Sequence, residues 1–157
     1  MIDAKRRILL KGSLAAGAVG VAVGAGLLAP RAVLAAWPQA AFEATDIKAG
    51  LKALIGVEAG ETGGEITIKA PDIAENGAVV PVTVESTATG VKSITIIAEG
   101  NQTPLIASFN LGEDATPSVS TRIKMAKTAN VQAVVQTADK VYTAAKEVKV
   151  TIGGCGG

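Results

Sequence analysis

The chain has 157 residues, of which 48% are hydrophobic and 3% aromatic, and it contains a single cysteine and no histidine. Its 15 basic and 14 acidic side chains include five basic residues and one acidic residue within positions 1–36, so 10 basic and 13 acidic residues remain beyond them. This net charge of −3 on about 120 residues excludes the basic face that nucleic-acid binding requires, and it indicates one domain with a modest core.

Residues 1–36 have the order of segments that an export signal requires. Lys5-Arg6-Arg7-Ile8-Leu9-Leu10-Lys11 combines paired arginines with apolar residues and a lysine, the pattern of a twin-arginine leader. A weakly apolar stretch over 14–29 follows, and Val33-Leu34-Ala35 offers an A-x-A-like cleavage site. The stretch is shorter than the roughly 18–20 strongly apolar residues that span a bilayer. We therefore predict export to the periplasm without a permanent membrane anchor.

A short helix is predicted at the start of the domain that spans residues 37–152. Between residues 42 and 55, apolar side chains recur at helical spacings: Phe42, Ile47, Leu51 and Leu54. Glu43 or Thr45 is placed to begin this helix, and Gly56 is placed to end it. A loop is expected over 60–64, after which the apolar residues alternate with the period of a strand.

Seven short runs with strand character follow, separated by turn signals. They are Glu65–Lys69, Ala78–Glu85, Val91–Ala98, Leu105–Phe109, Val119–Met125, Val131–Thr137 and Tyr142–Ile152. Pro81 lies inside the second run, which predicts an edge strand or a bulge there. Many short strands without a second long helix predict an all-β fold. We expect an immunoglobulin-like antiparallel β-sandwich with a short N-terminal helix, and a small barrel is the alternative.

Several other residues have both a functional and a structural interpretation. Glu113 and Asp114 suggest acid–base chemistry or cation binding, but we predict a solvated loop. Asn101 begins a glycosylation-type triplet that we predict to be a turn. Arg122 is expected to be an exposed strand residue, with contact to a partner or an anionic adduct as the alternative. A set of apolar strand residues is expected either in the core or at a subunit interface: Ile94, Ile96, Val131, Val134 and Val135.

The single cysteine lies in the last five residues, Gly153-Gly154-Cys155-Gly156-Gly157. Glycines widen the accessible backbone conformations and leave no side chains to pack around the thiol. Five extended residues reach roughly 17 Å at about 3.4 Å each. In the oxidising compartment to which the leader points, a lone cysteine indicates an intermolecular disulfide or a free reactive thiol. We therefore predict a flexible arm over 153–157 that leaves the last strand and presents sulfur to another protein.

Three parts of the sequence resemble one bacterial family. The C-terminal run Val148–Gly157 is similar to the signature of SoxY, the sulfur carrier subunit of the bacterial thiosulfate-oxidising Sox system. The interior runs Pro71–Val82 and Ser120–Ala126 agree with it, and so does the twin-arginine leader. The resemblance therefore covers essentially the whole chain.

The resemblance implies a covalent carrier that is a substrate of enzymes and not itself an enzyme. Pathway intermediates would be borne on the thiol of Cys155, with Gly153, Gly154, Gly156 and Gly157 as the arm, and with no metal or other cofactor. A second β-sandwich subunit, SoxZ, would form a heterodimer with the chain, and we expect it to cover an apolar sandwich face. A haem enzyme would join thiosulfate to the cysteine, a hydrolase would release sulfate, and an oxidoreductase would oxidise the remaining sulfane sulfur.

Two other function classes stay open on the residues alone. A thiol oxidoreductase centred on Cys155 would have neither a resolving cysteine nor a histidine, which counts against it. An exported structural or adhesive β-sandwich would use Cys155 for an intermolecular disulfide. No sequence neighbour of Cys155 is charged, so activation of a thiol whose pKa is about 8.5 when free would have to come from a partner's pocket.

Overall fold

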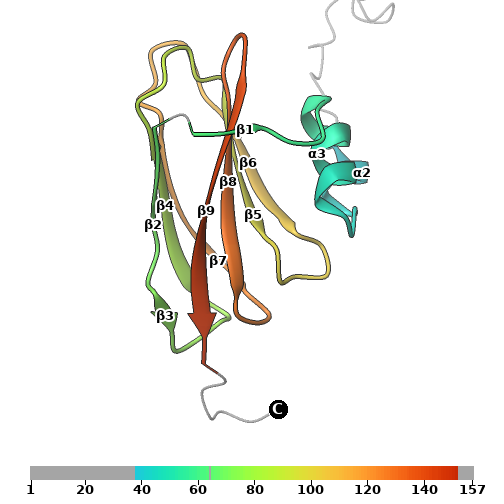
Figure 1. Cartoon of the computed structure of the whole chain (residues 1–157), viewed down its shortest axis with the longest axis vertical. Coiled ribbons are helices and arrows are strands. Elements are labelled where there is room, and N and C mark those ends of the chain that lie inside the picture. Colours follow the sequence, from blue (N-terminus) through green and yellow to red (C-terminus); the bar gives the residue numbers. More distant parts are fainter. Residues whose placement is uncertain (1–37, 64, 152–157) are drawn as a thin grey trace, which may run out of the picture. The chain divides into compact units, whose positions relative to one another are not determined.

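Two β-sheets pack face to face in the part of the chain that this computed structural model describes, residues 38–63 and 65–151 (Figure 1). The larger sheet has the strand order β1-β9-β8-β5-β6, with β3 also paired to β9, and the smaller has the order β2-β4-β7. The strands are β1 (Glu61–Thr62), β2 (Ile66–Lys69), β3 (Ile73–Ala74), β4 (Val80–Ser86), β5 (Ser93–Ala98), β6 (Leu105–Asn110), β7 (Ser118–Ile123), β8 (Ala129–Gln136) and β9 (Val141–Val150). The longer pairs are antiparallel, which confirms the predicted sandwich.

The space between the sheets is filled by side chains that alternate along the strands. In β4, Val80, Val82 and Val84 are buried and the residues between them are more exposed, as a strand with one face in the core requires. The apolar residues expected in the core or at a subunit interface are all buried within this chain: Ile94, Ile96, Val131 and Val135 between the sheets, and Val134 on the opposite face of β8. The core interpretation is therefore confirmed for all of them.

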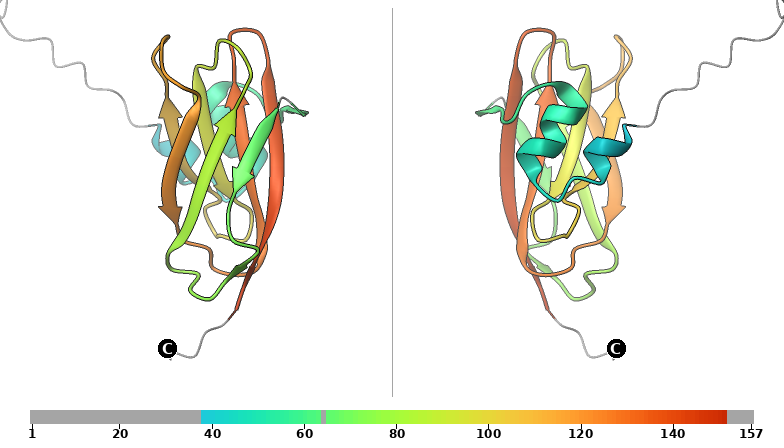
Figure 2. Two further views of the ribbon diagram at one scale, coloured as in Figure 1. Left: turned by 90° about the vertical axis from the view of Figure 1, so that its left-hand side faces the viewer. Right: turned by 90° about the vertical axis from the view of Figure 1, so that its right-hand side faces the viewer.

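Two helices, α2 (Gln39–Phe42) and α3 (Ile47–Ile55), cover the outer face of the larger sheet (Figure 2). Ala41 and Leu51 are buried there against side chains of the sheet: Ile97, Leu105 and Val134. Because β5 has the inter-sheet core on one side and this helical cover on the other, every residue from Ser93 to Ala98 is buried.

The helix predicted over 42–55 is divided in two, and its predicted start is wrong. Asp46, not Glu43 or Thr45, begins α3. Its backbone is extended, with φ −114° and ψ 134°, and its carboxylate accepts a hydrogen bond from the backbone N–H of Ala49 at 2.9 Å. A short side chain in this conformation satisfies a first-turn donor that has no partner within the helix. Gly56 ends α3 with a left-handed φ of 79°, as predicted.

Pro81 lies in the central strand of the smaller sheet, so the predicted edge strand is wrong. β4 pairs with β7 from Val80 to Glu85, but it pairs with β2 only from Thr83 to Ser86. Pro81 lies beyond the end of β2, whose last residue, Lys69, is opposite Thr83. The missing N–H of proline is tolerated there because β2 offers no carbonyl at that position.

Neither β1 nor β3 is indicated by the sequence pattern. β1 occupies part of the loop predicted over 60–64, and β3 lies between the predicted strands Glu65–Lys69 and Ala78–Glu85. Each strand has two residues and pairs in parallel with β9. A strand of two residues is too short to show an alternation of apolar and polar side chains. Its extended conformation therefore depends on pairing with the distant strand β9.

Candidate functional site

Cys155 and the glycines Gly153, Gly154, Gly156 and Gly157 lie outside the described residues, and so do Ile152 and the export signal predicted over 1–36. The last described residue is Thr151, directly after β9. The candidate site in the described part of the chain is therefore the surface around the end of β9, from which the segment with Cys155 continues (Figure 1). We call this surface the arm base and define it by residues 70–79, 124–128 and 146–151.

β9 is paired with β8 over most of its length, from Val141 to Val148. The antiparallel register runs from Gln136 opposite Val141 to Ala129 opposite Val148. Val148 is fully buried between the sheets, whereas Glu147 and Lys149 on either side of it are exposed. This alternation is that of a strand with one face in the core.

The segment with residues 70–79 binds the other edge of β9. The backbone N–H of Lys149 donates to Asp72 O at 3.0 Å, and the N–H of Thr151 donates to Ala74 O at 3.1 Å. Lys146 adds side-chain contacts, since its Nζ donates to Ala70 O at 2.6 Å and lies 3.0 Å from Asp72 Oδ1. The end of β9 is therefore held from both sides.

A tight contact at Gly77 connects this segment to the loop after β7. Met125 N–H donates to Gly77 O at 2.7 Å. A Cβ at position 77 would lie 2.5 Å from Met125 O and 2.8 Å from Val150 Cγ1, distances at which real side chains are not found. The same loop contacts β9 through Thr128, whose hydroxyl accepts a hydrogen bond from Val150 N–H at 2.9 Å. Only glycine allows the two segments and β9 to meet this closely.

Asn101 and Arg122 both lie near the arm base, but on different elements. The side chain of Asn101, in the predicted turn, donates to Lys124 O at 2.7 Å and accepts from Ala126 N–H at 2.8 Å. These two hydrogen bonds hold the loop after β7 against the turn that contains Asn101. Arg122 lies on β7 in register with Pro81 and is exposed, as predicted for a strand residue at this position.

Glu113 and Asp114 are exposed in the loop between β6 and β7, as a solvated loop requires. Within the described ranges, no three histidine, cysteine, aspartate or glutamate side chains are grouped so that they could hold a metal ion. In the same ranges, no helix is long and apolar enough to cross a membrane.

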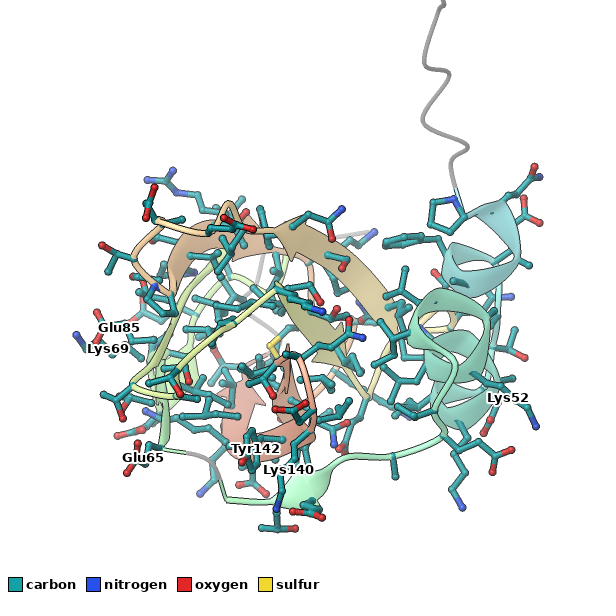
Figure 3. All side chains as sticks on the ribbon, turned by 90° about the horizontal axis from the view of Figure 1, so that it is seen from above. Lys52, Glu65, Lys69, Glu85, Lys140 and Tyr142 are labelled. Carbon is teal, nitrogen blue, oxygen red and sulfur yellow. The ribbon has the colours of Figure 1, made fainter. Side chains whose placement is uncertain are left out.

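An open cleft of about 590 Å³ lies around Glu65, Lys140 and Tyr142, which Figure 3 labels. Tyr142 is eight residues before Val150 on β9, or roughly 26 Å away at about 3.3 Å per residue. The cleft is therefore at the opposite end of the sandwich from the arm base. The residues that sequence reasoning singled out are not brought together there.

Two comparisons with known proteins identify the family. A family model described as sulfur oxidation protein SoxY matches residues 51–155, a range that ends at the cysteine. The solved structure of the sulfur carrier protein SoxY from Chlorobium limicola f thiosulfatophilum is 43% identical, with a TM-score of 0.61, and the match covers 68% of this chain and 97% of that one. A search of curated proteins finds no match.

More distant structures share the fold alone. A variant of the superoxide reductase (neelaredoxin) from Ignicoccus hospitalis is 18% identical, with a TM-score of 0.50, and the match covers 56% of this chain and 81% of that one. Identity this low supports a common sandwich and nothing about chemistry. The family match, in contrast, extends over more than half of the chain, and it confirms the resemblance found in the sequence. The chain belongs to the SoxY family of sulfur oxidation proteins.

Proposed function

We propose that this chain is a covalent sulfur carrier of periplasmic thiosulfate oxidation, and that Cys155 bears the sulfur intermediates. One observation carries the proposal: the SoxY family match ends at the single cysteine of the chain. The similarity to a sulfur carrier protein over 97% of its length supports the same role. As a carrier, the chain is a substrate of other enzymes, and it needs no cofactor of its own.

The arm base suits this role mechanically. β9 is paired with β8 up to Val148, and Val150 and Thr151 are hydrogen-bonded to Thr128 and Ala74, so the path to the thiol starts from a fixed point. Cys155 follows four residues later, which gives a reach of about 14 Å when extended. A thiol on such a tether can enter a pocket of another protein while the sandwich stays outside.

The chemistry requires only the thiol from this chain. Joining thiosulfate to the thiol of Cys155 forms a sulfur–sulfur bond and releases one proton and two electrons. A haem enzyme accepts the two electrons. Hydrolysis of the product removes the terminal sulfonate as sulfate and leaves a persulfide on the cysteine. An oxidoreductase then oxidises the outer sulfur. The thiolate is the reactive form in the first step, and the enzyme's pocket supplies its activation.

SoxZ is proposed as the second subunit of a heterodimer, but the expected apolar sandwich face is not found in the described part of the chain. The outer face of the smaller sheet carries polar side chains, including the pair Lys69–Glu85 and the hydrogen-bonded Thr83 and Ser120. The outer face of the larger sheet is covered by α2 and α3. A SoxZ contact on either face would therefore be more polar than the inner core.

The experiment that tests the proposed function is reconstitution with thiosulfate and the purified haem enzyme of the same Sox system. The parent chain should gain a thiosulfate-sized adduct, and Cys155→Ser should gain none while keeping its fold and its binding to SoxZ. A chain that gains no adduct, and whose only cysteine-dependent property is a covalent dimer, would support the structural or adhesive alternative instead. A turnover by the chain without any partner would support the oxidoreductase alternative.

A further inference from the structure

We propose that the arm base is the docking surface for the enzymes that act on Cys155, and that Ile73 and Val79 are its apolar contact residues. Lys124 and Lys149 lie beside them and meet carboxylates of the enzyme. This inference rests on the proposed carrier function. It adds a specificity determinant on the folded domain to the thiol on the arm.

The two most exposed large apolar side chains in the described part of the chain both belong to residues 70–79. Ile73 is 58% exposed and Val79 is 51% exposed. A single exposed apolar residue is ordinary on any protein surface. Two within seven residues, at the end of the molecule from which the arm leaves, are better explained by a contact that covers them.

Each of these apolar side chains lies next to an exposed lysine. Ile73 is in register with Lys149 in the parallel pair β3–β9. Val79 directly precedes Val80, and the exposed Lys124 directly follows Ile123, the residue opposite Val80. Neither lysine forms an ion pair with any described residue, whereas Lys146 is paired with Asp72. A partner surface that is apolar opposite Ile73 and Val79 and acidic opposite the two lysines would complement these four side chains.

The length of the segment between Thr151 and Cys155 indicates which kind of protein binds the arm base. Cys155 is four residues from Thr151, whose N–H is hydrogen-bonded to Ala74 O at 3.1 Å. An enzyme that encloses the thiol must bring the rim of its pocket within about 14 Å of this point. Its rim then meets residues 70–79. A subunit seated permanently on the same surface would stand between the arm and the pocket, so an enzyme that comes and goes is the occupant that fits.

The surface is also preorganised for a short-lived contact. Residues 70–79 are held to β9 by backbone hydrogen bonds and to the loop after β7 at Gly77, where no side chain fits. Little ordering of this segment is required on binding, which reduces the free-energy cost of docking. The exposed side chains of Ile73 and Val79 thus project from a fixed backbone.

The test compares an enzymatic and a chemical reaction of the same thiol. The double variant Ile73→Ser/Val79→Ser is prepared together with SoxZ, and Ala88→Ser/Thr89→Ser at the opposite end is the matched control. The purified haem enzyme conjugates thiosulfate to Cys155, followed by intact mass, and iodoacetamide alkylates Cys155 in a parallel sample. We expect the double variant to lower kcat/KM at least tenfold, mainly through KM, with an unchanged rate of alkylation.

The outcomes separate the inference from the proposed function. Conjugation of the double variant at the rate of the control overturns the docking surface but leaves the carrier role intact. Loss of SoxZ from the double variant also overturns it, because the surface would then belong to the subunit interface. If the parent chain is never conjugated, both proposals fail. A second variant, Lys124→Gln/Lys149→Gln, should raise KM at low ionic strength and lose this effect in high salt.

Discussion

At the scale of the residue, the interior run that resembles the SoxY family has a physical role at the arm base. Asp72 and Ala74 accept backbone hydrogen bonds from the end of β9, and Gly77 lies where any side chain would collide with Met125 and Val150. Ile73 is left to project outward. One short stretch of sequence thus holds the start of the arm and presents an apolar side chain beside it.

Gly77→Ala should destabilise the sandwich by about 1–3 kcal/mol, because the new methyl group forces Met125 and β9 apart. Gly112→Ala is the control, since a Cβ there meets nothing within 4 Å. Its effect should stay within about 0.5 kcal/mol. Denaturant unfolding of both variants checks this, and equal stabilities would show that residues 70–79 shift freely and do not hold β9.

At the scale of the element, most strands can be predicted from the local alternation of apolar residues. The features that this alternation does not predict depend on contacts with distant parts of the chain. Alternating valines predict β4, and Gly56 predicts the end of α3. β1 and β3 depend on pairing with β9, more than 70 residues away in the chain. The position of Pro81 depends on where β2 ends. Lengths and partners of this kind are set by the tertiary structure.

Asp46→Ala should weaken the helical cover of the larger sheet by about 0.5–2 kcal/mol, because the N–H of Ala49 loses its acceptor. Asp46→Asn is the matched control and should retain most of the stability, since an amide oxygen can accept the same bond. Thermal unfolding measures both. If the alanine and asparagine variants unfold at the same temperature, the side chain of Asp46 does not cap α3.

At the scale of the whole molecule, the proposed function divides between two parts of the chain: the sandwich holds the end of β9, and the segment after it presents the thiol. The sandwich holds Thr151 through its hydrogen bond to Ala74, and in the proposed carrier the four residues from Thr151 to Cys155 limit how far the thiol can reach. The sequence predicts Cys155 from its position and its glycine neighbours. It does not predict the arm base, because Ala74 and Thr151 are 77 residues apart and meet only in the fold. Ile73 and Val79 can be recognised as candidate contact residues only from their exposure in the structure.

Deleting Gly153 and Gly154 should shorten the reach of the thiol by about 7 Å. We expect enzymatic conjugation of thiosulfate to fall at least tenfold, while alkylation by iodoacetamide is unchanged. Deleting Gly156 and Gly157 removes as many residues without shortening the path from Thr151 to Cys155, and it serves as the control. Equal losses in the two deletions would argue against reach as the limiting property.

The central claim is that Cys155 carries sulfur in the cell. Intact mass spectrometry of the protein, isolated from cells grown on thiosulfate and measured with and without reductant, tests it most directly. We predict mass increments of sulfane, sulfonate or thiosulfonate size that map to the terminal peptide and disappear in Cys155→Ser. An unmodified thiol, or only a doubled mass that collapses on reduction, would contradict the carrier role.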